Sequence, residues 1–367
     1  MKNFVNPNLL ELMPYKPGKP VEELQRTYNL DRIVKLASNE NPFQIPENVK
    51  NKIREEIDNI ATYPCSDSHY LRMAIAEKSG LGIDNIMVGA GSVEIIKMIT
   101  RAFLNPGEKV LTSEKTFLMY KIAAIETQGA VSFIEAEMDS DFRFSLSNIM
   151  DKIDKSVKII FLTNPNNPTG TIVDGKEIAK FIESVPENIL VVLDNAYEEY
   201  VSRGADYLTG LEYINNKKNV IVLRTFSKVY GLAGLRIGYA LGHPETLSML
   251  SRVKAPFNVT RIAQNAALES LKSDDFKNKS YELNKKNKSL LLSQMSELGI
   301  KTIPSETNFL MFFPETDVTD LNDKLLKEGV IIRPLRAFGV PDAMRVTIGF
   351  EEDNDFFLEK LKKILGR

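Results

Sequence analysis

The stretch Thr225-Phe226-Ser227-Lys228-Val229-Tyr230-Gly231-Leu232-Ala233-Gly234-Leu235-Arg236-Ile237-Gly238 follows the apolar run 220–223 after one residue, Arg224. Such a run of β-branched and apolar residues predicts a short buried strand. Lys228 therefore comes at the carboxyl end of this strand, and Arg236 follows across a turn of small residues. A lysine is rare beside a buried strand unless it forms an imine with a carbonyl cofactor. A solvated loop lysine and a surface arginine are the simpler alternatives.

Other apolar runs predict the sheet to which this strand belongs. The runs 157–162, 189–193 and 220–223 lie about thirty residues apart, and segments such as 176–185 fit helices between them. This spacing is typical of βαβ units, which form a mostly parallel sheet with helices on both faces. A further strand is expected at 86–88, before a glycine turn and a helical pattern at 93–104. The predicted fold class is therefore α/β.

Polar residues follow each of these predicted strands, at the edge where ligands bind in open α/β sheets. They are Gly91 and Ser92 in the glycine turn, Asn167 within the segment 164–170, Asp194 with Tyr197, and Lys228. Amide groups of a glycine turn at a helix start attract an anion such as phosphate. Each residue also has an ordinary explanation as a helix cap or turn former. Together they predict one site with a phosphate cup, an amide, a carboxylate, a phenol and a lysine.

This combination meets the needs of pyridoxal phosphate (PLP). An aldehyde cofactor of this kind requires a lysine, an anion beside its pyridine nitrogen, donors to its ring oxygen and an anchor for its phosphate. Asp194 suits the nitrogen, and Tyr197 and Asn167 suit the ring oxygen. The residues expected to hold the phosphate are Gly91, Ser92, Ser227 and Arg236.

The glycine turn also allows a second interpretation, a dinucleotide-binding fingerprint in a nicotinamide-dependent dehydrogenase. Gly89-Ala90-Gly91 follows a strand, and Glu114 comes later as a possible ribose ligand. However, Glu94 occupies the position of the third glycine, and its carboxylate would repel a pyrophosphate. The fingerprint is therefore incomplete.

Composition excludes several other classes of function. The 367 residues carry 47 Lys and Arg against 49 Asp and Glu, a net charge of −2, so a nucleic-acid partner is not expected. Cys65 is the single cysteine, so no intrachain disulfide can form and a reducing compartment is expected. With two histidines, histidine-rich metal sites and Ser-His-Asp hydrolysis are poor candidates. The absence of a long apolar run predicts a soluble, cytoplasmic protein without membrane contact.

The length predicts about two domains. Prolines through 14–20 indicate that residues 1–30 form an arm without packed elements. Residues 31–255 are expected to form the large cofactor-binding domain, and 256–367 a smaller α+β domain with helical patterns at 274–298 and strands at 307–313 and 344–348. This smaller domain would supply Arg333 and Arg345, since guanidinium groups bind carboxylates and phosphates.

Over essentially its whole length the chain resembles the class I/II aminotransferases, and more closely the histidinol-phosphate aminotransferases. The segments that carry the resemblance are Pro14-Tyr15-Lys16-Pro17-Gly18-Lys19, Ala37-Ser38-Asn39-Glu40-Asn41-Pro42, Thr62-Tyr63-Pro64, Asn167-Pro168-Thr169-Gly170, Arg224-Thr225-Phe226-Ser227-Lys228, Ala255-Pro256-Phe257-Asn258 and the pair Arg333 and Arg345. The chain departs from the family in Asn195, where glutamate is usual, and in the segment 114–116, where a proline is usual.

The resemblance implies a fold-type I PLP-dependent transferase. Lys228 would be the imine lysine and the catalytic base, Phe117 would stack on the ring, and Tyr63 would reach the cofactor phosphate of the neighbouring subunit in a homodimer. Ala90 and Thr225 would join the cofactor site. The implied substrate ligands are Tyr15, Asn39, Arg333 and Arg345.

The implied reaction is transamination between L-histidinol phosphate and 2-oxoglutarate, which gives imidazole-acetol phosphate and L-glutamate, in histidine biosynthesis. Three alternatives stay open beside the dehydrogenase: an aromatic or broad amino-acid aminotransferase, a phosphothreonine decarboxylase-like enzyme, and a PLP-binding protein without turnover. The sequence does not rank them, because the lining of the side-chain pocket depends on geometry.

Overall fold

A computed structural model of the chain describes residues 4–12, 20–129 and 132–367. Its larger unit is built on a seven-stranded sheet in the order β2-β8-β7-β6-β5-β3-β4. Strand β8 is antiparallel to both of its neighbours, β2 and β7, whereas β7, β6, β5, β3 and β4 pair with one another in parallel. The strands are β2 (Ile86–Gly89), β3 (Lys109–Ser113), β4 (Phe133–Ala136), β5 (Val157–Thr163), β6 (Leu190–Asp194), β7 (Val220–Thr225) and β8 (Gly238–Gly242).

Alternating side chains of the central strands supply two separate cores. Ile159 and Phe161 of β5 face one core, whereas Ile160 and Leu162 face the other. The first core is closed by α4 (Ser92–Phe103), α5 (Met119–Gln128) and α8 (Pro244–Ser251). The second is closed by α2 (Glu47–Ile57), α3 (His69–Ser79), α6 (Leu146–Asp151), α7 (Gly175–Ser184) and α9 (Arg261–Ser270). Because both faces are covered, the middle residues of the central strands are apolar, and the prediction of a mostly parallel, helix-covered sheet is confirmed.

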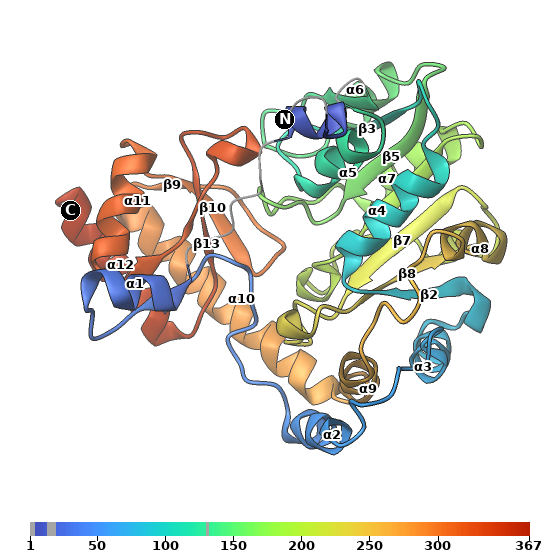
Figure 1. The fold of residues 1–367 in the computed structure, drawn as a ribbon. Coiled ribbons are helices and arrows are strands. Elements are labelled where there is room, and N and C mark those ends of the chain that lie inside the picture. The colour runs from blue at the N-terminus through green and yellow to red at the C-terminus, as the bar shows by residue number, and fades with distance from the viewer. Residues whose placement is uncertain (1–3, 13–19, 130–131) are drawn as a thin grey trace.

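A smaller unit lies beside this sheet (Figure 1). Its antiparallel sheet has the order β12-β13-β10-β9. The strands are β9 (Lys301–Thr302), β10 (Phe309–Phe313), β12 (Arg333–Pro334) and β13 (Met344–Thr347), and the helices are α10 (Asp274–Glu297), α11 (Val318–Lys327) and α12 (Glu351–Leu365). Helix α10 runs from beside α9 into the smaller unit and so connects the two. The domain limits at residues 30 and 255 stay a prediction.

The amino-terminal segment differs from the expectation that no packed element precedes residue 30. Helix α1 (Val21–Tyr28), drawn in dark blue in Figure 1, packs on the smaller unit, because Leu24 is buried with Ala37, Leu326 and Ile331. The prolines end at Pro20, just before the helix, and apolar residues then follow at helical spacing. Strand β1 (Val34–Lys35) continues this contact, because it pairs in parallel with β11 (Val330–Ile331).

Short 3₁₀ turns complete the described elements: η1 (Pro7–Glu11), η2 (Ile83–Asn85), η4 (Glu198–Tyr200), η5 (Leu211–Tyr213), η6 (Ala233–Leu235) and η7 (Arg336–Phe338). None of the helices in the described ranges combines the length and the hydropathy needed to span a bilayer. Across the same ranges, no group of three or more His, Cys, Asp or Glu side chains is placed to hold a metal ion.

Candidate active site

A cavity of about 210 Å³ lies where the large sheet meets the small one. Three strands of the large sheet end at it with Thr163, Asp194 and Thr225, and the small sheet contributes Arg333 and Arg345. The other residues predicted for the site that line it are Asn39, Ser92, Phe117, Asn167, Tyr197, Ser227, Lys228 and Arg236. The position of the cavity follows from the parallel strands, whose carboxyl ends share one edge.

Lys228 is half-buried in this cavity. Strand β7 ends at Thr225, whose Oγ1 accepts a hydrogen bond from the backbone N of Ser227 (3.1 Å) and so starts the turn that carries the lysine. The Lys228 Nζ lies 3.4 Å from the carbonyl oxygen of Ser38 and 5.4 Å from the ring centroid of Tyr197. The amine therefore projects into the cavity with one long backbone contact and an aromatic neighbour.

Asp194 is the buried acid of the site, with 2% of its surface exposed. Its Oδ2 accepts a hydrogen bond from Tyr120 Oη (2.7 Å), and its Oδ1 accepts one from the backbone N of Ala196 (3.2 Å). Burial raises the pKa of Asp194 to about 6, although these two hydrogen bonds and the charge of Lys228 act in the opposite direction. A cation placed beside this carboxyl group would favour its charged form.

Tyr120 was not predicted as part of the site. It is fully buried on α5, and its hydroxyl lies 2.8 Å from Thr163 Oγ1 as well as donating to Asp194. Its ring stacks on Phe161, with a centroid distance of 4.4 Å, and meets the edge of Phe117 at 5.6 Å. A phenol among the apolar residues of a core helix must find a polar partner, and this is the signal that could have identified it.

Tyr197 receives a hydrogen bond at its hydroxyl from Asn39 Nδ2 (2.9 Å). Asn39 is itself held by the smaller unit, since its backbone N donates to Thr347 Oγ1 (3.0 Å) and its carbonyl accepts from Asn308 Nδ2 (3.1 Å). Its φ of 54° is in the left-handed region, which asparagine tolerates. The phenol beside Lys228 is thus positioned jointly by both units.

A cup for an anion forms at the amino terminus of α4. Gly91 precedes the helix with a φ of 79°, and Ser92 begins it. Arg236 Nη1 lies 3.4 Å from Ser227 Oγ and 2.9 Å from the carbonyl oxygen of Ala233. Helix amides, hydroxyls and a guanidinium therefore converge as phosphate binding requires.

Two residues of the glycine turn support the cup rather than line the cavity. A Cβ atom on Gly91 would come within 2.8 Å of Arg236 Nη2. The backbone N of Ala90 donates to Glu94 Oε2 (2.6 Å), which also accepts from Asn258 Nδ2 (2.6 Å). Glu94 thus ties the turn to the segment that follows α8.

The two arginines of the smaller unit come from neighbouring strands. Arg333 of β12 and Arg345 of β13 are directly opposed in the antiparallel register, and both are buried. Arg345 Nη1 donates to Asn167 Oδ1, and Nη2 donates to the carbonyl oxygen of Ala37 (2.9 Å). The guanidinium of Arg333 lies 5.8 Å from the ring centroid of Phe338. Asn167, predicted as a ligand of a ring oxygen, is here also a partner of an arginine.

Of the predicted site residues that the structure describes, Ala90, Gly91 and Tyr63 do not line the cavity. Tyr63 is 77% exposed and stacks on Phe257, with a centroid distance of 4.5 Å, in the loop between α2 and α3. Tyr15 lies outside the described residues. The remaining groups are of the chemical types that PLP binding requires. They are a lysine, a buried acid, a phenol and an anion cup whose glycine leaves room for an arginine.

Comparisons with known proteins agree with this chemistry. The family model "Aminotransferase class I and II" matches residues 31–361. A histidinol-phosphate aminotransferase of Moorella thermoacetica is 40% identical over 98% of this chain and 92% of its own length. One from Anaeromyxobacter sp. (strain Fw109-5) is also 40% identical, over 99% of both chains.

Among solved structures, the histidinol-phosphate aminotransferase of Sinorhizobium meliloti in complex with pyridoxal-5'-phosphate is similar, with a TM-score of 0.89 and 26% identity over 99% of this chain and 98% of that one. The enzyme from Clostridium acetobutylicum has a TM-score of 0.83 and 26% identity, over 91% of this chain and 99% of that one. The resemblance drawn from the motifs is confirmed by these comparisons.

Proposed function

The chain belongs to the class I and II aminotransferases, and on this basis we propose that it is a PLP-dependent transaminase acting on histidinol phosphate. In the proposed reaction the amino group passes from L-histidinol phosphate to 2-oxoglutarate, giving imidazole-acetol phosphate and L-glutamate, as a step of histidine biosynthesis. The observation that carries the proposal is the single cavity that joins Lys228, Asp194 and the anion cup with Arg333 and Arg345.

When bound, PLP supplies an electron sink for the negative charge that develops on the substrate α-carbon. Asp194 would lie beside the pyridine nitrogen, where a charged carboxylate keeps that nitrogen protonated. Tyr197, held by Asn39, would donate to the ring oxygen. Ser92, Ser227 and Arg236 would hold the phosphate at the start of α4.

Lys228 is the group that would move the proton. A primary amine within the cavity can take a proton from the substrate α-carbon and return it to the neighbouring reacting carbon. The long contact to Ser38 leaves the amine free to turn between these two positions. Phe117, at the cavity wall beside Tyr120, would cover the ring face and keep water from the reacting carbons.

The two arginines support the choice of substrate. Histidinol phosphate has no α-carboxylate, so the charge that it presents to the smaller unit is a phosphate, which can engage two guanidinium groups. Each charge-assisted hydrogen bond contributes roughly 1.5 to 3 kcal/mol. Arg345, anchored on Asn167 and Ala37, would also bind a carboxylate of glutamate, whereas Arg333 would serve mainly the phosphate.

We therefore expect Arg333→Ala to reduce kcat/KM for histidinol phosphate by about ten- to a hundredfold. The same variant should affect glutamate much less, and Arg345→Ala should impair both half-reactions. The measurement compares histidinol phosphate, histidine, phenylalanine and phosphothreonine as amino donors with 2-oxoglutarate. If Arg333→Ala kept the preference for histidinol phosphate over phenylalanine, the phosphate role would be refuted and a broad aromatic aminotransferase would be the better assignment.

The same assay separates the remaining alternatives. Release of CO₂ from phosphothreonine would favour a decarboxylase, and cofactor uptake without turnover of any donor would favour a non-catalytic PLP-binding protein. Borohydride reduction followed by peptide mapping should label Lys228, and a label on another lysine would refute its role. The dehydrogenase interpretation is wrong, because the family match covers residues 31–361.

We also propose that the protein is a homodimer in which Tyr63 completes the partner's anion cup. Several large apolar side chains are exposed in α2, α3 and the loop between them that carries Tyr63, and such side chains are available for contact with a second subunit. They are Ile57 (52%), Ile60 (66%), Tyr70 (71%) and Met73 (50%).

A cytoplasmic location stays a prediction, based on the single cysteine.

A further inference from the structure

The loops that carry Lys228 and Tyr197 start from neighbouring strands and then separate. Strands β6 and β7 pair in parallel, and beyond their last paired residues the backbone N of Asn195 donates to the carbonyl oxygen of Leu223 (3.0 Å). One chain then continues through Tyr197 into η4, and the other through Thr225 toward Lys228. Past this backbone bond, the hydrogen bonds between the two loops, within the part of the chain that the structure describes, are made by side chains.

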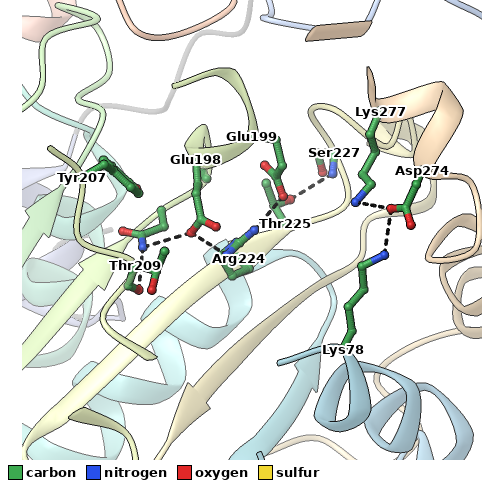
Figure 2. A network of polar contacts seen from close by, with 12 residues as sticks. Lys78, Glu198, Glu199, Tyr207, Thr209, Arg224, Thr225, Ser227, Asp274 and Lys277 are labelled. Carbon is green, nitrogen blue, oxygen red and sulfur yellow. Dashed lines mark hydrogen bonds and ion pairs between the residues drawn. The ribbon is translucent and has the colours of Figure 1, made fainter. Parts of the chain in front are cut away.

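An ion cluster connects the two loops outside the cavity. Arg224, the residue before Thr225, donates from Nη1 to Glu198 Oε2 and from Nη2 to Glu199 Oε1 (2.8 Å). Figure 2 shows Arg224 between these two carboxylates, with Thr225 and Ser227 close by. None of the three members of the cluster lines the cavity, whereas the residues next to them, Tyr197 and Thr225, do.

The cluster is largely shielded from water. The side chains of Arg224, Glu198 and Glu199 are 11%, 19% and 14% exposed. Asn195 Nδ2 adds a contact to Glu198 Oε2 (3.4 Å) and donates to the carbonyl oxygen of Thr209 (3.0 Å). Buried ion pairs contribute little net stability compared with apolar packing, but breaking one is costly because it leaves an uncompensated buried charge.

We propose that Arg224, with Glu198 and Glu199, is a positioning residue that sets the distance and orientation between Lys228 and the Tyr197–Asp194 loop. The planar guanidinium engages both carboxylates at once, so it holds η4 against the end of β7 in one arrangement. Lysine at position 224 would retain the charge but not this two-sided contact. The proposal rests on the proposed function, because it concerns the lysine and the phenol that would contact the cofactor.

The test is an absorbance titration of the purified, cofactor-loaded protein against pH. The midpoint of the cofactor band reports the surroundings of the Lys228 linkage and does not depend on turnover. Arg224→Met should move this midpoint by at least about half a pH unit, and it should weaken cofactor binding by about tenfold or more, as is usual when an outer partner of a ligand-holding group is lost. Arg224→Lys should restore the wild-type behaviour only in part.

A double-variant cycle tests whether the cluster acts as one unit. Glu198→Gln should change the midpoint in the same direction as Arg224→Met, and the double variant should change it no more than Arg224→Met alone. If Arg224→Met did not fold, Glu198→Gln and Arg224→Lys would decide the question by the same readout. If the shift of the midpoint in the double variant equalled the sum of the shifts in the two single variants, a shared positioning role would be refuted.

The matched control is Leu361→Ala, which removes a fully buried side chain of α12 in the smaller unit. This variant should lose stability and keep the wild-type midpoint and cofactor affinity. If Arg224→Met were destabilised to the same degree and also kept both values, the cluster would be only structural and the proposal would be wrong. A wild-type protein without any cofactor band would instead refute the proposed function.

Discussion

Gly91 is the residue at which a single methyl group should disturb the anion cup. A Cβ atom there would lie 2.8 Å from Arg236 Nη2, and the backbone has a φ of 79°. Gly91→Ala should therefore displace the guanidinium and weaken PLP binding by about tenfold, equivalent to about 1.4 kcal/mol. Equilibrium titration with the cofactor measures the effect.

Gly107 offers a matched control for this change. Its φ is 84°, and nothing lies within 4 Å of a Cβ atom placed there. Gly107→Ala therefore carries the same backbone cost, about 1 kcal/mol, without a steric conflict. Equal cofactor affinities in the two variants would show that the contact with Arg236 is unimportant.

Asp194 should make the stability of the cofactor-free protein depend on pH. Burial raises its pKa from 3.8 to about 6, so the folded state holds this proton more tightly than the unfolded state does. The contribution of this group to the free energy of unfolding is fully present below about pH 4 and is lost as the pH rises through 6. The total loss is about 3 kcal/mol. Asp194→Asn removes this loss, so the variant should gain stability relative to wild type between pH 4 and pH 7.

Urea unfolding of the cofactor-free proteins at the two pH values measures this difference. Asp355→Asn, at an exposed position of α12, controls for the removal of a negative charge. Saturating cofactor should reverse the ranking, because a cation beside the carboxylate favours its charged form. A difference between wild type and Asp194→Asn that is the same at pH 4 and pH 7 would contradict the expectation.

Among the elements, α10 connects the two units, and its first residue is attached to the large one. Asp274 accepts hydrogen bonds from Lys277 of the same helix (2.6 Å) and from Lys78 of α3 (2.9 Å), as Figure 2 shows. These bonds hold the pKa of Asp274 at about 2. The carboxylate also lies at a helix amino terminus, where negative charge is favourable.

Asp274→Asn should lower the free energy of unfolding at pH 7 by about 1 kcal/mol or less, because the carboxylate is mostly exposed and screened by solvent. A lowered pKa means that the stabilisation is present above about pH 4 and is lost as the pH falls toward 2. Denaturant unfolding should thus show a difference from wild type that shrinks over this range and also with added salt. Asp275→Asn, in the same turn of the helix, is the control and should lower the free energy of unfolding by less. If both variants lowered it equally, the stabilisation would come from the helix terminus and not from the contacts with Lys78 and Lys277.

At the scale of the whole molecule, the two units share the active cavity. The large sheet supplies Lys228 and Asp194 at the ends of its strands, and the small sheet supplies Arg333 and Arg345. Asn39 joins the units by contacts with Tyr197 on one side and Thr347 on the other. A substrate that bridges from the lysine to the arginines would therefore stabilise the contact between the units.

The proposed homodimer gives a prediction about shared sites. If Tyr63 serves the partner's cup, mixing inactive Lys228→Ala with Tyr63→Phe subunits should restore about a quarter of wild-type activity, since half of randomly formed dimers are mixed and each holds one intact site. Subunits are exchanged by mild unfolding and refolding, and activity is assayed with gel-filtration analysis. Tyr70→Phe, at another exposed tyrosine, is the control and should be active alone. A monomer in solution, or no recovery in the mixture, would contradict the proposal.

The sequence alone determined the parallel sheet and the edge at which the site lies, because strand spacing and apolar runs are local features that reflect burial directly. Lys228, Asp194 and Asn167 could be assigned to one edge since each follows a strand of the same sheet. The packing of the helix at 21–28 was not predicted from these local features, because its core partners Leu326 and Ile331 come from the far end of the chain.

Only the tertiary structure decided which side chains support the site. The hydrogen bond from Tyr120 to Asp194, the contact of Asn39 with Tyr197 and the cluster around Arg224 join residues on different elements. Their pairing depends on how helices lie on the sheet and how loops diverge from neighbouring strands. Neither arrangement is encoded in local periodicity, since it is the packing of distant apolar surfaces that brings these polar groups together.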